Sequence, residues 1–345
     1  MNDVKSEIKR MARTVSTTQL IEQRARENSK PQKRNDPYRL GLAIEGGGMR
    51  GVVAGGMVSG LEELGLRDVF DVVCGTSAGA ASAAYFVAGQ AKLGTSIFYE
   101  DINNEKFIDL WNLCRGRPIM SVDFLIDEVF KRSKPLDWEV LEDCPIELNI
   151  VTTDIDRGDY VALKEFGGND NIFEALRASA RIPLIAGPPV VIRGKRMMDG
   201  GLVQPIPVEP AIQAGCTHIL VLLTRPPAVL RGQPRLIDHV FLGPLMAMRF
   251  GRKVQQMYLN RPRLYKRVIE DLQRRTSDST SWPRIDFIQL PASTAEIDRL
   301  EKSHEILVAG ARNAMKAVFR RFEFAGGNIT SPEPYFSAGA DHRRS

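Results

Sequence analysis

Hydrophobic and polar positions change their period along the chain, and these changes predict alternating strands and helices. Apolar runs predict strands over residues 40–45, 70–74, 146–152, 217–223 and 285–290. The first run is continuously apolar, which is typical of a parallel strand that is covered on both faces. Two more extended segments predict hairpin strands, one over residues 160–164 and one over residues 190–198 with its turn at Gly194.

Apolar residues at helical spacing predict the helices that connect these strands. They cover residues 51–64, the Ala-rich stretch after Ser77, and residues 172–179, 208–214 and 296–322. Residues 97–130 are helical in character, with broken periodicity around Gly116 and Pro118. Gly65 follows the first helix, where a glycine commonly ends one. Alternating strands and helices indicate a sheet with helices on both faces. We therefore predict a three-layer α/β/α fold with a largely parallel central sheet.

Composition places the chain among soluble globular proteins. Its 345 residues are 43% hydrophobic and 26% charged, enough for one large α/β domain or two small ones. No apolar run approaches the roughly 20 residues that cross a bilayer, and residues 1–13 lack the apolar core of a signal peptide. The four cysteines are scattered, without a Cys-x-x-Cys pair. We expect free thiols in a cytoplasmic protein that can contact the inner membrane surface peripherally.

Three stretches differ in composition from the rest of the predicted domain at residues 40–325. Residues 1–39 are polar and predict a loosely packed extension, although apolar residues at helical spacing over 4–15 also allow a membrane-surface helix or a dimer arm. Residues 326–345 are rich in Gly and Ser and predict a disordered tail. The third stretch, residues 225–281, is helical and strongly basic.

Residues 225–281 have two interpretations. Arginines lie there beside apolar residues at Phe241, Leu245, Met246 and Phe250. The segment is either a lid or docking region for an anionic membrane, or a solvated helical excursion. The net charge of +5 favours anionic partners in general. Because the chain lacks zinc-finger spacing and an arginine-rich arm with interleaved aromatics, we expect lipid contact and no nucleic acid.

A serine turn follows the second predicted strand. Gly75, Ser77 and Gly79 fit the pattern Gly-x-Ser-x-Gly between a strand and a helix, which is the nucleophile elbow of acyl hydrolases. Glycines flank the serine because side chains there would collide with neighbouring backbone. The alternative is a tight turn in which the serine only caps the following helix.

A glycine turn follows the first predicted strand in the same way. It reads Gly46, Gly47, Gly48, Met49, Arg50, Gly51. This spacing also fits a dinucleotide-binding loop, but that site needs an acidic residue at the end of the second strand, and Asp71 lies at its beginning. We therefore predict an oxyanion hole, in which backbone N–H groups bind a negative oxygen and Arg50 adds charge.

A serine nucleophile needs a base, and Asp199 is the stronger candidate. It follows an extended segment, and Gly200 and Gly201 free the backbone to present its carboxylate. None of the four histidines lies in a glycine-flanked turn at a strand end, so structural roles are favoured for them. An ordinary Asp-Gly-Gly turn is the alternative for Asp199.

The three turns together resemble the patatin-like phospholipases. A fourth motif agrees, because residues 178–183 (Ala-Ser-Ala-Arg-Ile-Pro) are similar to the segment that precedes the aspartate in that family. The resemblance covers residues 40–224 well. It implies a Ser–Asp dyad of Ser77 and Asp199, an oxyanion site at the glycine turn, and neither a metal nor a cofactor. The substrate it implies is a phospholipid or another fatty acyl ester.

Two other functions remain open from the residues alone. One is an α/β-hydrolase-type esterase with a triad of Ser77, Asp199 or Asp154, and His304. The other is a non-catalytic module that binds a nucleotide or a lipid headgroup in the glycine turn.

Overall fold

The computed structural model describes residues 15–112, 114–167, 169–227 and 242–322. Three predictions lie partly or wholly outside them: most of the apolar stripe over residues 4–15, the disordered tail at 326–345, and Phe241 in the basic segment. The described part of the chain contains no helix that is both long and apolar enough to cross a bilayer.

The described strands form one mixed sheet, in the order β5-β6-β3-β2-β1-β7-β8, with β4 paired to β3. Their bounds are β1 Leu40–Ile44, β2 Val72–Thr76, β3 Glu147–Asp154, β4 Asp159–Leu163, β5 Val190–Ile192, β6 Lys195–Asp199, β7 His218–Leu222 and β8 Arg284–Ile288. Strands β3, β2, β1, β7 and β8 are mutually parallel, and β4, β5 and β6 add antiparallel pairs beside β3. The predicted largely parallel sheet is confirmed.

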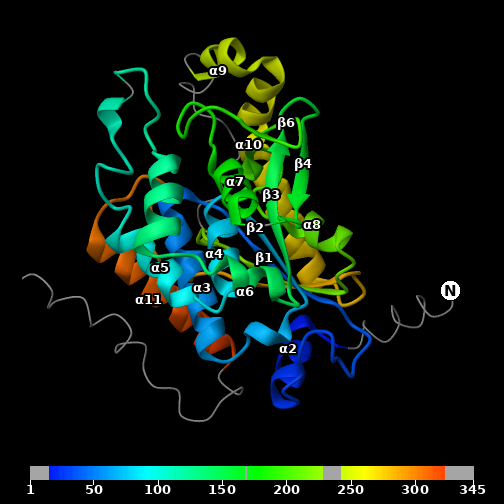
Figure 1. The fold of residues 1–345 in the computed structure, drawn as a ribbon. Coiled ribbons are helices and arrows are strands. Elements are labelled where there is room, and N and C mark those ends of the chain that lie inside the picture. The colour runs from blue at the N-terminus through cyan, green and yellow to red at the C-terminus, as the bar shows by residue number, and fades with distance from the viewer. Residues whose placement is uncertain (1–14, 113, 168, 228–241, 323–345) are drawn as a thin grey trace, which may run out of the picture.

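Helices cover both faces of this sheet (Figure 1). Their bounds are α2 Thr17–Arg26, α3 Gly51–Glu63, α4 Ala78–Val87, α5 Ala91–Glu100, α6 Trp138–Asp143, α7 Asn169–Ala180, α8 Val208–Gln213, α9 Gly243–Phe250, α10 Arg252–Ser277 and α11 His304–Arg321, with a π-helix over Phe124–Ser133. Strand β1 shows why three layers form. Leu42 and Ile44 pack toward α3 and α11, whereas Ala43 packs toward α8 and α10. The predicted three-layer α/β/α fold is confirmed.

Residues 15–39 differ from the expected loose extension. Leu20 and Ile21 in α2 are fully buried in the main core, and so is the side chain of Arg24. The Arg24 guanidinium forms ion pairs with Asp36 and Asp71, both at 2.7 Å. The polar composition of this stretch therefore reflects a buried ion-pair network that attaches it to the sheet.

Two predictions need correction, one for the start of a helix and one for Met246. The helix expected over 296–322 begins at His304, because Ser303 caps its N-terminus and residues 296–303 form an irregular segment. The region 97–130, expected to be helical with a break around Gly116 and Pro118, contains α5, which ends at Glu100, and the π-helix, which begins at Phe124. Met246 on α9, expected at a docking surface, is 1% exposed, because its side chain packs in an apolar cluster with Val254 and Met198.

Candidate active site

Ser77 lies at the sharp turn between β2 and α4. Its backbone φ is 56°, a left-handed conformation that residues other than glycine rarely adopt. The flanking glycines are required by close packing: a Cβ on Gly75 would lie 2.4 Å from the carbonyl oxygen of Gly79, and one on Gly79 would lie 2.5 Å from that of Ile44. Backbone strain of this kind costs about 1–3 kcal/mol and is common at functional sites.

Ser179, at the end of α7, holds this strained turn in place. Its Oγ accepts a hydrogen bond from the backbone N–H of Ser77 at 2.9 Å and donates one to the carbonyl of Val151 at 2.7 Å. The Ser179 side chain is fully buried. The motif over residues 178–183 thus has a physical role in this chain, which is to fix the backbone of the serine turn to β3.

The glycine turn presents backbone N–H groups beside Ser77. Among the described residues, the amides of Gly47 and Gly48 have no hydrogen-bond acceptor, whereas Met49 donates its amide to the carbonyl of Arg299 at 3.1 Å. Gly48 has φ +61°, and a Cβ there would lie 2.8 Å from the same Arg299 carbonyl oxygen. Two of the predicted oxyanion donors are therefore free to bind a ligand, and the Met49 amide is already occupied.

Arg50 is buried and bound to other groups. Its Nη1 pairs with Glu296 at 2.8 Å, and its Nε donates to the hydroxyl of Thr224 at 3.3 Å. The same hydroxyl donates to the carbonyl of Gly46 at 3.1 Å. Arg50 therefore links the glycine turn to residues 296–299, which is a different use from the free oxyanion charge expected from the sequence.

Asp199 ends β6 and is 5% exposed. Its Oδ1 accepts the amide of Gly201 at 2.6 Å, and its own backbone carbonyl accepts the hydroxyl of Thr153 at 2.8 Å. Burial raises the pKa of Asp199 above its ordinary value. The nearby Ser77 side chain opposes this rise of the pKa most strongly, followed by the Gly201 amide and the charges of Arg261 and Arg299.

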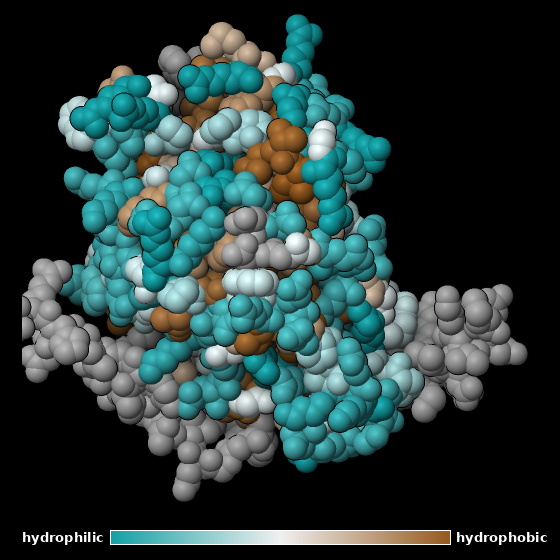
Figure 2. Space-filling model, viewed as in Figure 1, coloured by the Kyte–Doolittle hydropathy of each residue, from teal (hydrophilic) through white to brown (hydrophobic). Residues whose placement is uncertain are grey.

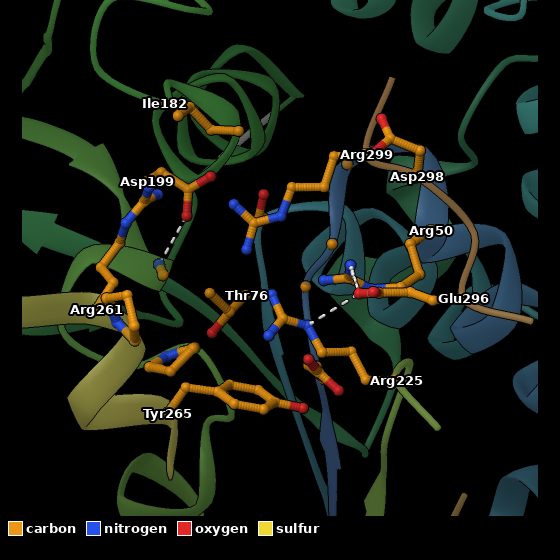
Figure 3. A pocket seen from close by; sticks show the side chains of 18 of the residues that line it. Arg50, Thr76, Ile182, Asp199, Arg225, Arg261, Tyr265, Glu296, Asp298 and Arg299 are labelled. Atoms are coloured by element: carbon orange, nitrogen blue, oxygen red, sulfur yellow. Dashed lines mark hydrogen bonds and ion pairs between the residues drawn. The ribbon is translucent and has the colours of Figure 1, made fainter. Parts of the chain in front are cut away.

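A cavity of about 450 Å³ brings these groups together at one edge of the sheet. Ser77, Asp199 and the glycine turn line it, and so do side chains from α10 and from residues 296–299 (Figure 3). Parallel strands β1 and β2 end here side by side, which is where ligands of open α/β sheets bind.

A second, apolar pocket begins at the same serine. Ser77, Gly48 and Ile182 line both spaces, and the second continues between α4, α5 and the π-helix. Its walls are almost entirely hydrophobic, with Ala81, Leu125 and Phe130 among them. Ser77 therefore stands between a polar cavity and an apolar one.

This arrangement agrees with a comparison with protein families. Residues 42–212 match the family model of the patatin-like phospholipases, and they contain the glycine turn, Ser77, Ser179 and Asp199. Over these residues the chain belongs to the patatin-like phospholipase family. The basic helices α9 and α10 lie outside the matched range of this patatin-like domain.

The chain is similar to several curated proteins. It is 25% identical to the uncharacterized protein YjjU of Escherichia coli over 201 residues, covering 55% of this chain and 53% of that protein. It is 27% identical to lysophospholipase nte1 of Emericella nidulans over 175 residues, covering 49% of this chain and 11% of that protein. The chain thus spans about half the length of the first relative and a small part of the second. Among solved structures, VipD of Legionella pneumophila aligns with 84% of this chain and 67% of its own at a TM-score of 0.37 and 10% identity.

The described histidines lie apart from the cavity of the patatin-like domain. His304 is exposed at the start of α11, with its ring against Tyr99. His218 is fully buried in β7, where burial lowers its pKa to about 4. His239 and His342 lie outside the described residues. Asp154, the other acid considered for a triad, accepts the backbone amides of Asp156 and Arg157.

Several cavity residues were missed as site residues in the sequence, and four of them are charged groups that meet near Asp199. They are Arg225, Arg261, Glu296 and Arg299. For Arg225 and Arg261 the sequence signal was the excess of arginine over residues 225–281, which does not show which arginines face the serine. Glu296 and Arg299 lie outside that segment, and no motif marked them. Groups of His, Cys, Asp and Glu that could hold a metal ion do not occur within the described ranges.

Proposed function

We propose that this protein is a serine acyl hydrolase of patatin type, acting as a phospholipase A, lysophospholipase or lipid esterase. The observation that carries the proposal is that the strained Ser77 and the buried Asp199 line one cavity with two unoccupied amides of the glycine turn. The family match and the relative named as a lysophospholipase support the same class of reaction.

In this mechanism the Ser77 hydroxyl attacks the ester carbonyl while Asp199 accepts its proton. The amides of Gly47 and Gly48 are the donors for the oxyanion, and each such donor typically contributes roughly 3–4 kcal/mol to transition-state stabilisation. When the tetrahedral intermediate collapses, Asp199 protonates the departing alcohol and the acyl group remains on Ser77. Water, deprotonated by Asp199, then releases the fatty acid.

Burial of Asp199 suits this role. A carboxylate with an ordinary pKa is a weak base, and desolvation makes it a stronger one by raising that pKa. The fatty acyl chain would occupy the apolar pocket beyond Ser77, whose hydrophobic walls match a hydrocarbon chain. That pocket has a volume of only about 50 Å³, so the chain must move side chains apart as it enters.

We also propose that the domain contacts membranes with the end at which the cavity lies. Leu110 and Trp111 are 60% and 72% exposed, and Met248 on α9 is 77% exposed. Their segments project beyond the end of the sheet to which the β3 arrow points (Figure 1). Figure 2 shows a largely polar face on which apolar side chains gather toward this end. Exposed tryptophan beside arginine is suited to a lipid–water interface.

The proposal is tested with Ser77→Ala and Asp199→Ala, assayed on a fatty acyl ester with circular dichroism as the folding control. Both should abolish hydrolysis while the fold is kept. Substitution of each histidine in turn should leave hydrolysis in place. Turnover by either dyad variant would refute the dyad, and loss of turnover in one histidine variant would favour a triad. Absence of hydrolysis in the native protein on a mixed lipid extract would favour a binding module.

A further inference from the structure

Four arginines from different parts of the chain meet in the cavity. Arg50 comes from the glycine turn, Arg225 follows β7, Arg261 lies on α10, and Arg299 lies in the segment before α11. In Figure 3 the side chains of Arg50, Arg225 and Arg299 point into the space between Asp199 and Glu296. The Arg261 side chain lies beside Asp199, on the side away from Glu296. Several guanidinium groups in one enclosed space lower the stability of the fold through desolvation and mutual repulsion unless each has a partner of opposite charge.

Only two of these arginines are paired with a carboxylate. Arg50 and Arg225 share Glu296, at 2.8 and 3.7 Å. Arg261 lies over the ring of Tyr258 at 3.8 Å and donates its Nε to the Tyr258 carbonyl at 3.4 Å. Within the described ranges no carboxylate lies at ion-pair distance from Arg261 or Arg299, although the charge of Asp199 acts on both.

The remaining acids of the cavity are bound to backbone amides. Glu45 accepts the amide of Thr224 at 2.6 Å, and Asp298 accepts that of Leu300 at 2.8 Å. Asp199 accepts the amide of Gly201. Among the described residues, the terminal guanidinium nitrogens of Arg261 and of Arg299 have neither a hydrogen-bond acceptor nor an ion-pair partner, so they can bind an anion that enters the cavity.

Electrostatics supports an anion in that place. Burial lowers the pKa of Arg299, and the charges of Arg261, Arg50 and Arg225 lower it further. A bound anion would offset this repulsion. Guanidinium groups bind phosphate through paired N–H donors, so two of them match a phosphate group well.

We propose that Arg261 and Arg299 form a phosphate subsite that recognises the headgroup phosphate of the substrate, so that the preferred substrates are phosphate-bearing acyl esters. This inference rests on the proposed acyl hydrolase function and names its substrate class. The geometry orients the substrate: the phosphate lies with the arginines in the polar cavity, the acyl chain lies in the apolar pocket, and the ester lies at Ser77 between them.

The test compares two esters with the same acyl chains, phosphatidylglycerol and diacylglycerol, in micelles of a neutral detergent. The measured quantity is the ratio of their kcat/KM values. Arg261→Gln and Arg299→Gln should each lower this ratio about ten- to a hundredfold, the range for loss of one hydrogen bond to a charged group. Arg263→Gln is the matched control, because Arg263 lies on the same helix but is exposed and outside the cavity lining. It should keep the native ratio.

A second arm uses Ser77→Ala protein, which cannot turn over, and measures binding of glycerol 3-phosphate and of inorganic phosphate by calorimetry. Tighter binding of glycerol 3-phosphate that Arg299→Gln abolishes supports a headgroup site. Equal binding of both anions, together with an unchanged ester ratio in the variants, would assign the site to free phosphate and overturn the headgroup inference.

Three outcomes distinguish a failure of the phosphate subsite from a failure of the proposed acyl hydrolase function. If the native protein hydrolyses diacylglycerol and phosphatidylglycerol and the arginine variants keep the native ratio, the subsite is refuted and the hydrolase stands. An effect of the arginines only on Asp199 would also refute the subsite. It would move the acid limb of the pH profile upward for both esters alike, because loss of a nearby positive charge raises the carboxyl pKa. If the native protein hydrolyses no ester at all, the hydrolase itself is refuted.

Discussion

The Ser179 hydroxyl joins the amide of Ser77 to the carbonyl of Val151, with hydrogen bonds of 2.9 and 2.7 Å. The residue that the sequence marks as nucleophile is thus held by a side chain that lies 102 positions away in the chain. The left-handed backbone at Ser77 is unfavourable locally, so the turn needs such external support.

Removal of this support should affect both stability and catalysis. Ser179→Ala leaves a buried N–H and a buried C=O with one partner fewer, so we expect the free energy of unfolding to fall by about 1–3 kcal/mol. The serine turn should also lose its fixed geometry, lowering kcat about tenfold. Chemical denaturation and steady-state kinetics measure the two effects. Ser82→Ala is the control and should change neither quantity, because among the described residues the Ser82 hydroxyl bonds only to the carbonyl of Ala78 in its own helix.

Asp199→Asn should abolish activity and stabilise the fold at neutral pH. Burial raises the pKa of Asp199 in the folded state above its ordinary value of 3.8. Well below pH 3.8 the carboxyl is therefore neutral in both the folded and the unfolded protein, and its burial does not lower the free energy of unfolding there through ionisation. As pH rises through the folded pKa, ionisation of the buried group is less favourable than in the unfolded chain, and stability is lost. The melting temperature of the variant should exceed that of the native protein at pH 7 and approach it toward pH 4. An equal difference at both pH values would show that Asp199 is not desolvated as described.

The same raised pKa sets the acid limb of the activity profile. Because the base must be ionised, kcat/KM should fall as pH falls through the folded-state pKa of Asp199, above the ordinary value of 3.8. A pH–rate profile on a neutral ester measures this limb. A limb at or below 3.8 would contradict the role of burial.

The apolar pocket should determine which acyl chains are accepted. Ala81→Leu places a larger side chain in this space, so the ratio of activity on long-chain to short-chain esters should fall severalfold. A series of p-nitrophenyl esters of increasing chain length measures the preference. Ala81→Ser, similar in size to the native residue, serves as the control, and an unchanged preference in Ala81→Leu would show that the acyl chain lies elsewhere.

The N-terminal ion pairs should contribute strongly to stability. Arg24→Met removes the buried partner of Asp36 and one of the two arginines that pair with Asp71, which keeps Arg34 at 2.8 Å. We expect a loss of about 3–5 kcal/mol in the free energy of unfolding. Arg26→Met is the matched control in the same helix, because Arg26 is exposed and its ion pair in the described part of the chain is with Glu22 at 3.5 Å. Denaturant titration compares the two. Similar losses in the free energy of unfolding for both variants would show that the burial of Arg24 does not determine its contribution to stability.

Membrane contact should depend on the exposed tryptophan. Trp111→Ala should weaken binding to anionic vesicles, and added salt should weaken it further, because surface charges are screened. Co-sedimentation with vesicles of stated phosphatidylglycerol content measures this. Val140→Ala is the control, since Val140 is an exposed residue on α6, away from α9 in Figure 1. Binding that ignores Trp111, salt and lipid charge alike would refute the docking proposal.

The sequence by itself determined the parts of this protein that depend on neighbouring residues. Two strand–turn–helix units need glycine at positions where a Cβ would clash with adjacent backbone, one at residues 75–79 and one at residues 46–51. Their motifs can therefore be recognised from a few neighbouring residues. The apolar runs of the parallel strands are visible for the same reason, because burial on both faces requires them. Three-layer architecture and family resemblance followed from these local patterns.

Only the tertiary structure decided which distant side chains share a space. Arg261 and Arg299 enter the cavity from two segments whose charged sequences look like solvated surface. Arg50 turned out to be bound to Glu296, and residues 15–39 joined the core through Arg24 and Asp71. The sequence alone does not distinguish a charged residue that is solvated from one that is buried against a partner. Its free energy depends on the partner and the surrounding dielectric, and both are set by how the chain folds back on itself.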